Sequence, residues 1–425
     1  MAPLRPLLLL SFAVLLAFPA GAAVRLTTAV DGAMVEVGWP RDAFPIRTVA
    51  DQRLLAALPG GVAALELAFA AWASVPNARV SFASDGAAGG LRAGRDGRNV
   101  ITVADDLFAN QRAIAVTTNW DVNGRLVESD IQVDLPMINS SYNIQQAITH
   151  EVGHLLGLDH SGVLSAVMYP YVSRGNDAVV LDSDDRVGIA AMYPDLDLTS
   201  LGGVLRGRVA GDGGGIFAAQ VVAMNDRGEA VATTLTSPSG EFLLEGIPDG
   251  TYRIYAEPLD GPVDLKNLSP YWRQGSAASF PTRFHSGHPF EVVSGKLYGN
   301  LVVTAAGGAD LNPRWLAVSP AGSTDFKLGS TAATVRPGQT FSLAVGGDGM
   351  ISGMTTFDVL SPTIRRVSNF RYAANYMYAD FEVAPETPDG SVVILMERGQ
   401  ETAALTGALR IQNGAAGGRG RIARR

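Results

Sequence analysis

Eleven residues in the middle of the chain have the composition and spacing of a metal site. Residues 150–160 read His-Glu-Val-Gly-His-Leu-Leu-Gly-Leu-Asp-His, and they hold three of the five histidines in the 425-residue sequence. On a helix, residues four positions apart share a face, so His150 and His154 can direct two imidazoles at one ion. Glu151 follows the first histidine, and its carboxylate can reach a water on the same metal. The pattern predicts a zinc site with a general base beside it.

The second half of the motif supplies a turn and a third ligand. Gly157 can adopt the left-handed conformation that ends a helix and turns the chain sharply. After this turn, His160 can return to the metal. Three protein ligands leave a fourth coordination position open, which is typical of catalytic rather than structural zinc.

The motif and the residues after it resemble the matrixin branch of the metzincins, the matrix metalloproteinase family, over about residues 35–197. Ser161 follows the third histidine, and residues 166–171 read Ala-Val-Met-Tyr-Pro-Tyr, where metzincins place a methionine turn. The resemblance implies that Met168 lies beneath the metal without binding it. Astacins carry a metal-binding tyrosine two residues after the methionine, but Tyr169 follows directly and Pro170 holds that position, so no fifth protein ligand is expected.

The same resemblance implies a fold, a substrate and further roles. The catalytic domain should be an α+β domain, with a twisted mixed sheet and an active-site helix. Asp184 and Asp185 match paired aspartates that brace the methionine turn and receive the mature N-terminus. Residues 113–118 match the edge strand that pairs with an extended polypeptide substrate. Cofactors would be one catalytic Zn²⁺ and, as an open alternative to plain solvation, Ca²⁺ on Asp121, Asp130 and Asp134.

Composition restricts the compartment and the partners. The net charge of −8 and pI near 5.2 argue against nucleic acid as a partner. Residues 1–23 read as an export signal, with Arg5, an apolar core and a small-residue cleavage site, and the core is too short to span a bilayer. No cysteine is present, so the cysteine that keeps vertebrate matrixins latent cannot exist here. We expect a secreted protein without an integral membrane span. Composition favours a bacterial source, with the periplasm or cell surface as alternatives.

Local patterns predict the elements that must position the site. An alanine-rich run predicts a helix over residues 62–75, and strands are expected at 78–82, 99–103, 113–120 and 125–134. Asp121-Val-Asn-Gly124 is a strong hairpin turn between the last two. Asn143 should begin the active-site helix, with Gln146 in capping-box register.

Three units follow from changes of pattern along the chain. The catalytic domain is expected at residues 24–198. Residues 203–306 resemble a carboxypeptidase-regulatory-like domain, a small transthyretin-type β-sandwich, and residues 310–413 look like an immunoglobulin-like sandwich. Both β-domains could bind other proteins or surface polymers. The tail at 414–425 is glycine- and arginine-rich and should be a disordered basic segment.

The sequence therefore predicts a secreted zinc metalloendopeptidase, in which a zinc-activated water attacks peptide bonds and Glu151 is the general base. The alternative is an adhesive surface or matrix protein whose protease domain is secondary or inactive. Glu151 separates the two, because decayed sites usually lose the base or a ligand. A narrower alternative is a zinc hydrolase of cell-wall peptides. The loop at about residues 172–180, which should govern side-chain preference, has no readable chemistry.

Overall fold

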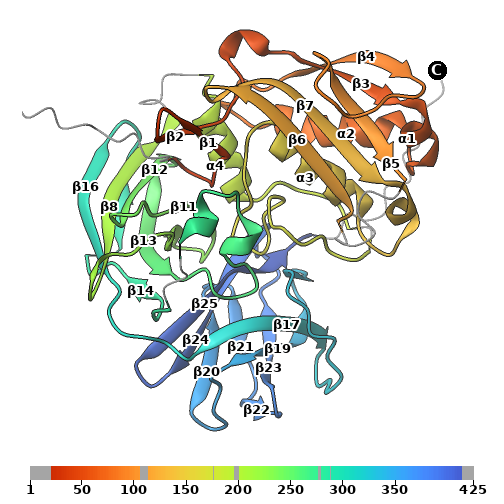
Figure 1. Cartoon of the computed structure of the whole chain (residues 1–425). Coiled ribbons are helices and arrows are strands. Elements are labelled where there is room, and N and C mark those ends of the chain that lie inside the picture. The colour runs from red at the N-terminus through yellow and green to blue at the C-terminus, as the bar shows by residue number, and fades with distance from the viewer. Residues whose placement is uncertain are drawn as a thin grey trace, which may run out of the picture.

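The computed structural model describes residues 21–105, 113–175, 177–195, 201–275, 279–287 and 289–413. The predicted basic tail and all but the last three residues of the predicted export signal lie outside these ranges. The described chain is mostly β, with few helices (Figure 1). Its sheets fall into three groups along the chain, which we call units, and the second and third of these are the β-rich units. None of its described helices is long and apolar enough to cross a membrane.

The first unit is built on a five-stranded sheet in the order β4-β3-β5-β7-β6. Its strands are β3 (Ile46–Asp51), β4 (Phe82–Ala88), β5 (Asn99–Ala104), β6 (Ala115–Val122) and β7 (Arg125–Asp134). All neighbours run parallel except β6, which pairs antiparallel with β7 and forms the edge of the sheet. Asn123 and Gly124 both have positive φ in the two-residue turn between them, as the hairpin signal predicts.

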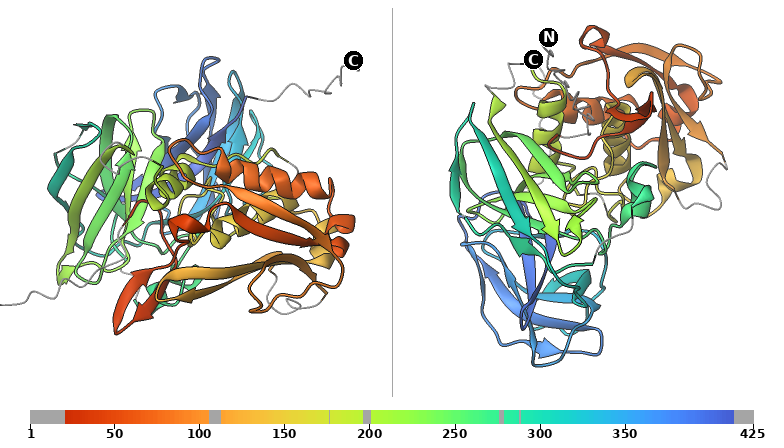
Figure 2. Two further views of the ribbon diagram at one scale, coloured as in Figure 1. Left: turned by 90° about the horizontal axis from the view of Figure 1, so that it is seen from above. Right: turned by 60° about the vertical axis from the view of Figure 1, so that its left-hand side comes forward.

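Helices lie on one side of this sheet (Figure 2). They are α1 (Gln52–Ala57), α2 (Val62–Ala73) and α3 (Ile144–Leu155), whereas α4 (Ser183–Met192) packs between this unit and the next. One 3₁₀ turn, η1 (Arg41–Ala43), precedes β3, and a second, η2 (Leu135–Asn139), lies between β7 and α3. The indole of Trp72 on α2 donates to Thr149 O on α3 at 2.8 Å, which fixes the two helices together. A two-stranded hairpin, β1 (Thr27–Val30) and β2 (Ala33–Glu36), precedes the sheet.

One predicted strand begins later than expected. Residues 78–81 lie outside the strand, which starts at Phe82, although Ser81 O accepts a hydrogen bond from Ile46 N on β3 at 2.9 Å. Instead, Ala78 forms an isolated bridge with Pro194, and Arg79 N donates to Tyr193 O at 2.7 Å. Segment 78–81 therefore ties the end of the first unit back to its beginning.

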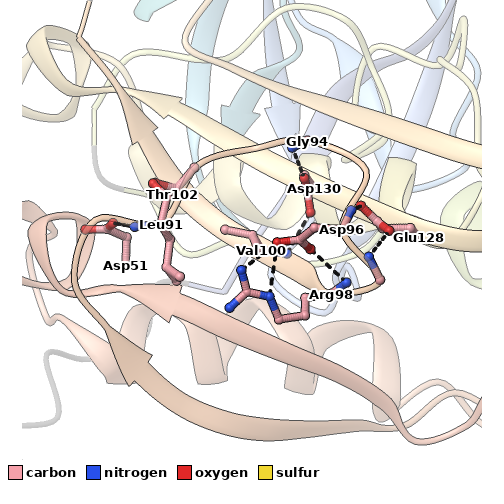
Figure 3. Close-up of polar contacts among 10 residues, drawn as sticks. Asp51, Leu91, Gly94, Asp96, Arg98, Val100, Thr102, Glu128 and Asp130 are labelled. Atoms are coloured by element: carbon pink, nitrogen blue, oxygen red, sulfur yellow. Dashed lines mark hydrogen bonds and ion pairs between the residues drawn. The ribbon is translucent and has the colours of Figure 1, made fainter.

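The loop before β5 is held to the sheet by buried carboxylates (Figure 3). Asp130 accepts hydrogen bonds from Gly94 N and Val100 N, both at 2.8 Å. Glu128 accepts from Asp96 N at 2.8 Å and from Gly97 N at 2.5 Å. Burial raises the pKa of Asp130. These oxygens are occupied by backbone N–H groups, so their role in the fold is to anchor this loop.

Two pairs of sheets follow, each with an apolar core between its members. The first pair is β11-β10-β13-β14, with β15 also on β13, and β12-β8-β16, with β9 also on β8. Its bounds are β8 (Gly203–Gly211), β9 (Gly214–Gly215), β10 (Gln220–Asn225), β11 (Ala230–Leu235), β12 (Glu241–Ile247), β13 (Gly250–Glu257), β14 (Arg283–Phe284), β15 (Phe290–Val292) and β16 (Leu297–Thr304). Two 3₁₀ turns, η3 (Leu265–Asn267) and η4 (Trp272–Gln274), lie in the segment between β13 and β14.

The second pair is β17-β19-β23-β21, with β22 also on β23, and β18-β25-β24-β20. Its bounds are β17 (Asn312–Pro320), β18 (Ala333–Val335), β19 (Thr340–Asp348), β20 (Thr355–Val359), β21 (Ile364–Arg366), β22 (Arg371–Tyr372), β23 (Tyr376–Val383), β24 (Gly390–Arg398) and β25 (Glu401–Ile411). The C-terminal half of the described chain is thus β-rich.

The segment at residues 161–170 is buried where the three units meet. Leu164 and Tyr169 join the core of the last sheet pair, and Val163 packs with Tyr255 and Val393. Leu164 N also donates to Thr406 O on β25 at 2.9 Å. The residues that carry the predicted methionine turn are therefore held by both β-rich units as well as by their own.

We predict that a buried carboxyl between the two β-rich units makes stability depend on pH. Glu257 accepts from Gln220 Nε2 at 2.7 Å and from Thr406 Oγ1 at 2.6 Å, and burial raises its pKa to about 7. A carboxyl whose pKa is higher in the folded than in the unfolded chain adds stability below its unfolded pKa of about 4.3, and this stability is lost as the pH rises through 7. We expect a loss on the order of 3 kcal/mol between about pH 4 and pH 9, measured by chemical unfolding.

In Glu257→Gln, an uncharged side chain can accept the same two hydrogen bonds, so the pH dependence should become shallower. Glu241→Gln, at an exposed position on β12, is the matched control and should leave the profile unchanged. Equal profiles for the wild type and Glu257→Gln would contradict this assignment.

Candidate metal centre and active-site cleft

The helix α3 begins where its cap predicts, but the cap is only half of a capping box. Asn143 Oδ1 accepts from Gln146 N at 3.1 Å. The expected return bond from Gln146 to Asn143 is absent from the described structure, because Gln146 Oε1 accepts from Ser173 N at 3.1 Å and Ser173 Oγ at 2.6 Å. Asn143 N donates to Ser173 O instead, at 2.9 Å. The Gln146 side chain and the Asn143 backbone therefore fix the loop after the methionine segment to the start of the helix.

Three histidines converge at the other end of this helix. His150 and His154 lie one turn apart on α3, and the chain reverses after it to bring His160 back. One ring nitrogen from each lies within 4.8 Å of the others, and this is the one cluster of three metal-ligating side chains within the described residues. The Nε2 atoms of His154 and His160 are 3.2 Å apart. Two nitrogens about 2.0–2.1 Å from one tetrahedral Zn²⁺ lie about 3.3 Å apart, so this spacing fits the ion.

The second nitrogen of each ring shows which atom is free to bind a metal. His150 Nδ1 lies 2.7 Å from Val167 O, His154 Nδ1 lies 2.8 Å from Leu158 O, and His160 Nδ1 contacts Asn267 O. A carbonyl oxygen only accepts, so each Nδ1 carries the proton and each Nε2 presents a lone pair. The close approach of two Nε2 lone pairs is unfavourable without a cation between them. The donor set therefore fits Zn²⁺.

The site also keeps these rings neutral. Burial lowers the pKa of His150 to about 3, and it lowers the pKa of His154 well below the ordinary value, with further effects from neighbouring imidazoles. Burial lowers the pKa of His160 too. Neutral imidazole is the form that binds metal.

Glu151 points to the edge strand rather than to a basic partner. Its Oε2 accepts a hydrogen bond from Thr117 Oγ1 at 2.6 Å, and burial raises its pKa to about 7. Asn119 Nδ2, two residues along β6, donates to His154 O at 2.9 Å. We did not identify Thr117 and Asn119 from the sequence. Two polar residues at alternate positions of one strand share a face, and this pattern could have indicated that both face the helix.

The methionine segment lies directly against the helix. A methyl group at Gly153 would be 2.2 Å from Met168 Sδ and 2.8 Å from Trp72 Cζ2, so Met168 packs on the helix between its two histidines. Asp185 accepts from Val167 N at 2.7 Å and Met168 N at 3.1 Å, which holds this segment in place. Burial raises the pKa of Asp185 to about 7.

Asp184 and Tyr169 form hydrogen bonds with the β-rich units and none with the three histidines or Glu151 among the described residues. Asp184 Oδ2 accepts from Ser161 Oγ at 2.7 Å, and its Oδ1 accepts from Thr233 N and Thr233 Oγ1 on β11 at 2.7 and 2.9 Å. Among the described residues, Asp184 therefore joins the residue after His160 to strand β11. Tyr169 is buried, and its hydroxyl donates to Ser330 O in the last unit.

The three aspartates considered for calcium are not brought together as one cluster within the described residues. Asp130 holds the loop described above, and Asp121 Oδ1 accepts from Gly124 N at 3.0 Å in the hairpin turn. Each of these two has a local structural role that does not need an ion.

Gly157 occupies a position that no other residue fits, and we predict that Gly157→Ala destabilises the site. Its φ is +100°, and an added Cβ would be 2.5 Å from Val37 O. The strained backbone and the overlap together should cost about 1–3 kcal/mol and displace His160. Chemical unfolding and zinc titration measure the two effects. Gly213→Ala is the control, since nothing lies within 4 Å of the added methyl there; equal losses in both variants would contradict the prediction.

A cleft of about 1320 Å³ runs past these side chains. Residues 113–117 of the edge-strand segment, together with Glu151 and the three histidines, line one side. The other side is lined by residues 267–270 of the first β-rich pair and residues 327–334 of the second. The cleft therefore lies between the predicted substrate strand and both C-terminal units, an arrangement that we did not predict.

Residues 62–194 match the matrixin family of metallopeptidases. The chain is 39% identical over 75 residues to the metalloendoproteinase 2-MMP of Arabidopsis thaliana, which is 18% of this chain and 18% of that protein. It is 35% identical over 75 residues to karilysin of Tannerella forsythia, 18% of this chain and 12% of that protein. Among solved structures, the major pilin subunit of Bacillus cereus aligns with 50% of this chain over 69% of its own length, at 8% identity. The TM-score of this alignment is 0.17, which is too low to bear on the fold.

These matches describe one part of the chain. The chain spans less than a fifth of the length of each of these two relatives. The matrixin match at residues 62–194 includes the three converging histidines. These matches do not confirm the resemblance of residues 203–306 to a carboxypeptidase-regulatory-like domain.

Proposed function

We propose that the chain is a secreted zinc metalloendopeptidase that cuts internal peptide bonds of extended polypeptides. The observation that carries the proposal is the arrangement of His150, His154 and His160, with their Nδ1 atoms bound to carbonyls and Glu151 next to them on the same helix. The matrixin match over residues 62–194 supports the same activity.

The residues have separate roles in this proposal. The three histidines hold Zn²⁺, which, when bound, lowers the pKa of a water and draws electrons from the scissile carbonyl. Glu151 accepts a proton from the attacking water and passes it to the leaving amine. Its burial suits this exchange, because a carboxyl with a pKa near 7 can both take and return a proton near neutral pH. Thr117 holds the carboxylate on the side of the edge strand.

The substrate main chain is proposed to add to the free edge of β6. This strand pairs only with β7 among the described strands, and its first residues line the cleft with Glu151. An extended peptide can bond to such an edge and place its side chains in the cleft. The three-unit division and the supporting roles of Met168, Gly157, Tyr169, Asp184 and Asp185 belong to the same proposal.

The test is to incubate the purified, zinc-loaded chain with an unfolded protein and to sequence the products by mass spectrometry. We expect cleavage at internal peptide bonds of several unrelated substrates. Cleavage confined to cell-wall peptides would favour the narrower hydrolase. Zinc binding without any cleavage would favour the adhesive alternative.

A further inference from the structure

The third histidine differs from the other two in where its supporting carbonyl comes from. His150 and His154 bind the carbonyls of Val167 and Leu158, which belong to the same unit. His160 Nδ1 binds Asn267 O, 107 residues further along the chain, in the segment between β13 and β14. A β-rich unit therefore supplies a group in direct contact with a proposed metal ligand.

The Asn267 carbonyl belongs to a turn, η3, that side chains cap and pack. Asp264 Oδ1 accepts from Lys266 N at 2.7 Å, and Asp264 N donates to Asn267 Oδ1 at 3.0 Å, so the two side chains cap the turn η3 reciprocally. Leu268 beside it is buried together with Trp272 and Val24. Hydrogen bonds and apolar packing thus both hold the turn in place.

A second bond docks the loop onto the metal centre. Asp159 Oδ1 accepts from His160 N at 2.8 Å, and its Oδ2 accepts from Ser269 N at 2.9 Å. One carboxylate therefore holds both the backbone of His160 and the loop that supports its ring. Asn267 Nδ2 also lies 3.3 Å from the hydroxyl of Tyr171.

We propose that residues Asp264–Ser269 are part of the metal centre, with the Asn267 carbonyl as the group that orients His160 for Zn²⁺. The carbonyl fixes the Nδ1–H tautomer and turns the ring so that Nε2 faces the other two histidines. Groups that orient metal ligands in this way typically change metal affinity by 10–100-fold when lost. The β-rich unit then sets how tightly the protease holds its metal. This inference rests on the proposed zinc site.

Three variants of the full chain test it. Asn267→Ala removes the side chain that caps η3, Asn267→Asp retains an acceptor at the same place, and Lys266→Ala changes an exposed side chain in the same turn. Zinc affinity is measured by competition with a chromophoric chelator, and the visible spectrum of the Co²⁺-substituted protein reports ligand geometry. We expect Asn267→Ala to bind zinc roughly 10-fold or more weakly with an altered cobalt spectrum, Asn267→Asp to recover most of the affinity, and Lys266→Ala to match the wild type.

Unchanged zinc affinity and cobalt spectrum in Asn267→Ala would overturn the proposal, and so would an equal loss in Lys266→Ala. Thermal unfolding of the metal-free proteins shows whether Asn267→Ala folds. If it does not, Ser269→Ala and Ser269→Pro form a second pair. Ser269→Ala keeps the N–H that donates to Asp159 and should match the wild type, whereas Ser269→Pro removes this N–H, fixes the backbone φ and should bind zinc more weakly. A wild-type chain that binds no zinc would instead reject the proposed function.

The charges along the cleft support an independent inference about the substrate. Arg174, Arg273 and Lys327 line the cleft and are exposed, and none of the three forms an ion pair within the described part of the chain. Arg174 also stacks on Tyr142 at 5.2 Å. Of the acidic lining residues, Asp159 is engaged as above and Glu151 is the proposed base, which leaves Asp177. The cleft is thus basic in a chain whose net charge is −8.

We infer that the protease prefers polypeptides with acidic side chains beside the scissile bond, where they would pass Arg273 and Lys327. This rests on the proposed activity. Matched peptides, one with glutamates and one with glutamines at the flanking positions, give the ratio of kcat/KM at low and high salt. We expect a several-fold preference for the acidic peptide that falls with salt, and that is lost in Lys327→Glu but kept in Lys296→Glu, an exposed residue outside the cleft.

Equal rates for the two peptides, or an equal change in both variants, would overturn this specificity. Failure to cut either peptide, together with failure to cut unfolded protein, would reject the proposed activity instead.

Discussion

Glu151→Ala is expected to lower kcat for peptide hydrolysis by roughly 10²–10⁴-fold while the protein keeps its zinc. The carboxylate is the one acidic side chain on α3, it is next to His150, and its Oε2 is held by Thr117 at 2.6 Å. It is not a ligand in the proposed site, so its loss removes proton transfer without opening the metal centre. The measurement is single-turnover cleavage of an unfolded protein, with zinc content determined on the same sample.

Two controls define this result. Glu66→Ala changes an exposed glutamate on α2 and should leave both rate and zinc content unchanged. Glu151→Gln can keep the bond from Thr117 but cannot take a proton, so it should be as slow as Glu151→Ala. Hydrolysis by Glu151→Gln at the wild-type rate would rule out Glu151 as the base.

Local sequence signals predicted those parts of the site that depend on neighbouring residues. The two histidines on α3 and the hairpin before β7 follow from spacing alone, because a helix and a two-residue turn fix their geometry within a few residues. The edge position of β6 came from the family resemblance. The short helix α1 was missed, although Asp51 caps it by accepting from Arg53 N at 2.6 Å. Six residues carry too little periodicity to identify a helix.

Two of the contacts that could not be predicted cross between units. Asn267 supports His160 through its backbone carbonyl. Every residue has such a carbonyl, so no residue type in the sequence could indicate this contact. Thr233 likewise donates two hydrogen bonds to Asp184 only because the folded chain brings β11 against α4. Gln146 shows the limit of a local rule, because its side chain fits a capping box and yet binds Ser173. Long-range packing decides such choices.

Removal of zinc is expected to abolish cleavage and also to lower the thermal stability of the chain. Without the ion, His150 remains buried and His154 and His160 half-buried, with the Nε2 lone pairs of the last two 3.2 Å apart. Their burial and lowered pKa values mean that protons cannot easily replace the metal. If zinc binds the folded chain and not the unfolded one, it raises the free energy of unfolding. The increase is about 2.7 kcal/mol at a free zinc concentration 100 times Kd and about 4.1 kcal/mol at 1,000 times Kd.

Differential scanning calorimetry and cleavage assays should follow the same zinc titration after chelator treatment. Zn²⁺ should restore both stability and activity, whereas Mg²⁺, which prefers oxygen ligands, should restore neither. His154→Ala should bind no zinc tightly and show no stabilisation, and His285→Ala, a histidine outside the cluster, should behave as the wild type. Because α3 packs on α2 and the methionine segment contacts both β-rich units, we expect the metal to raise the unfolding temperature of the whole described chain in one transition. Zinc-dependent stabilisation of only one of several resolved transitions would show that the three units unfold independently.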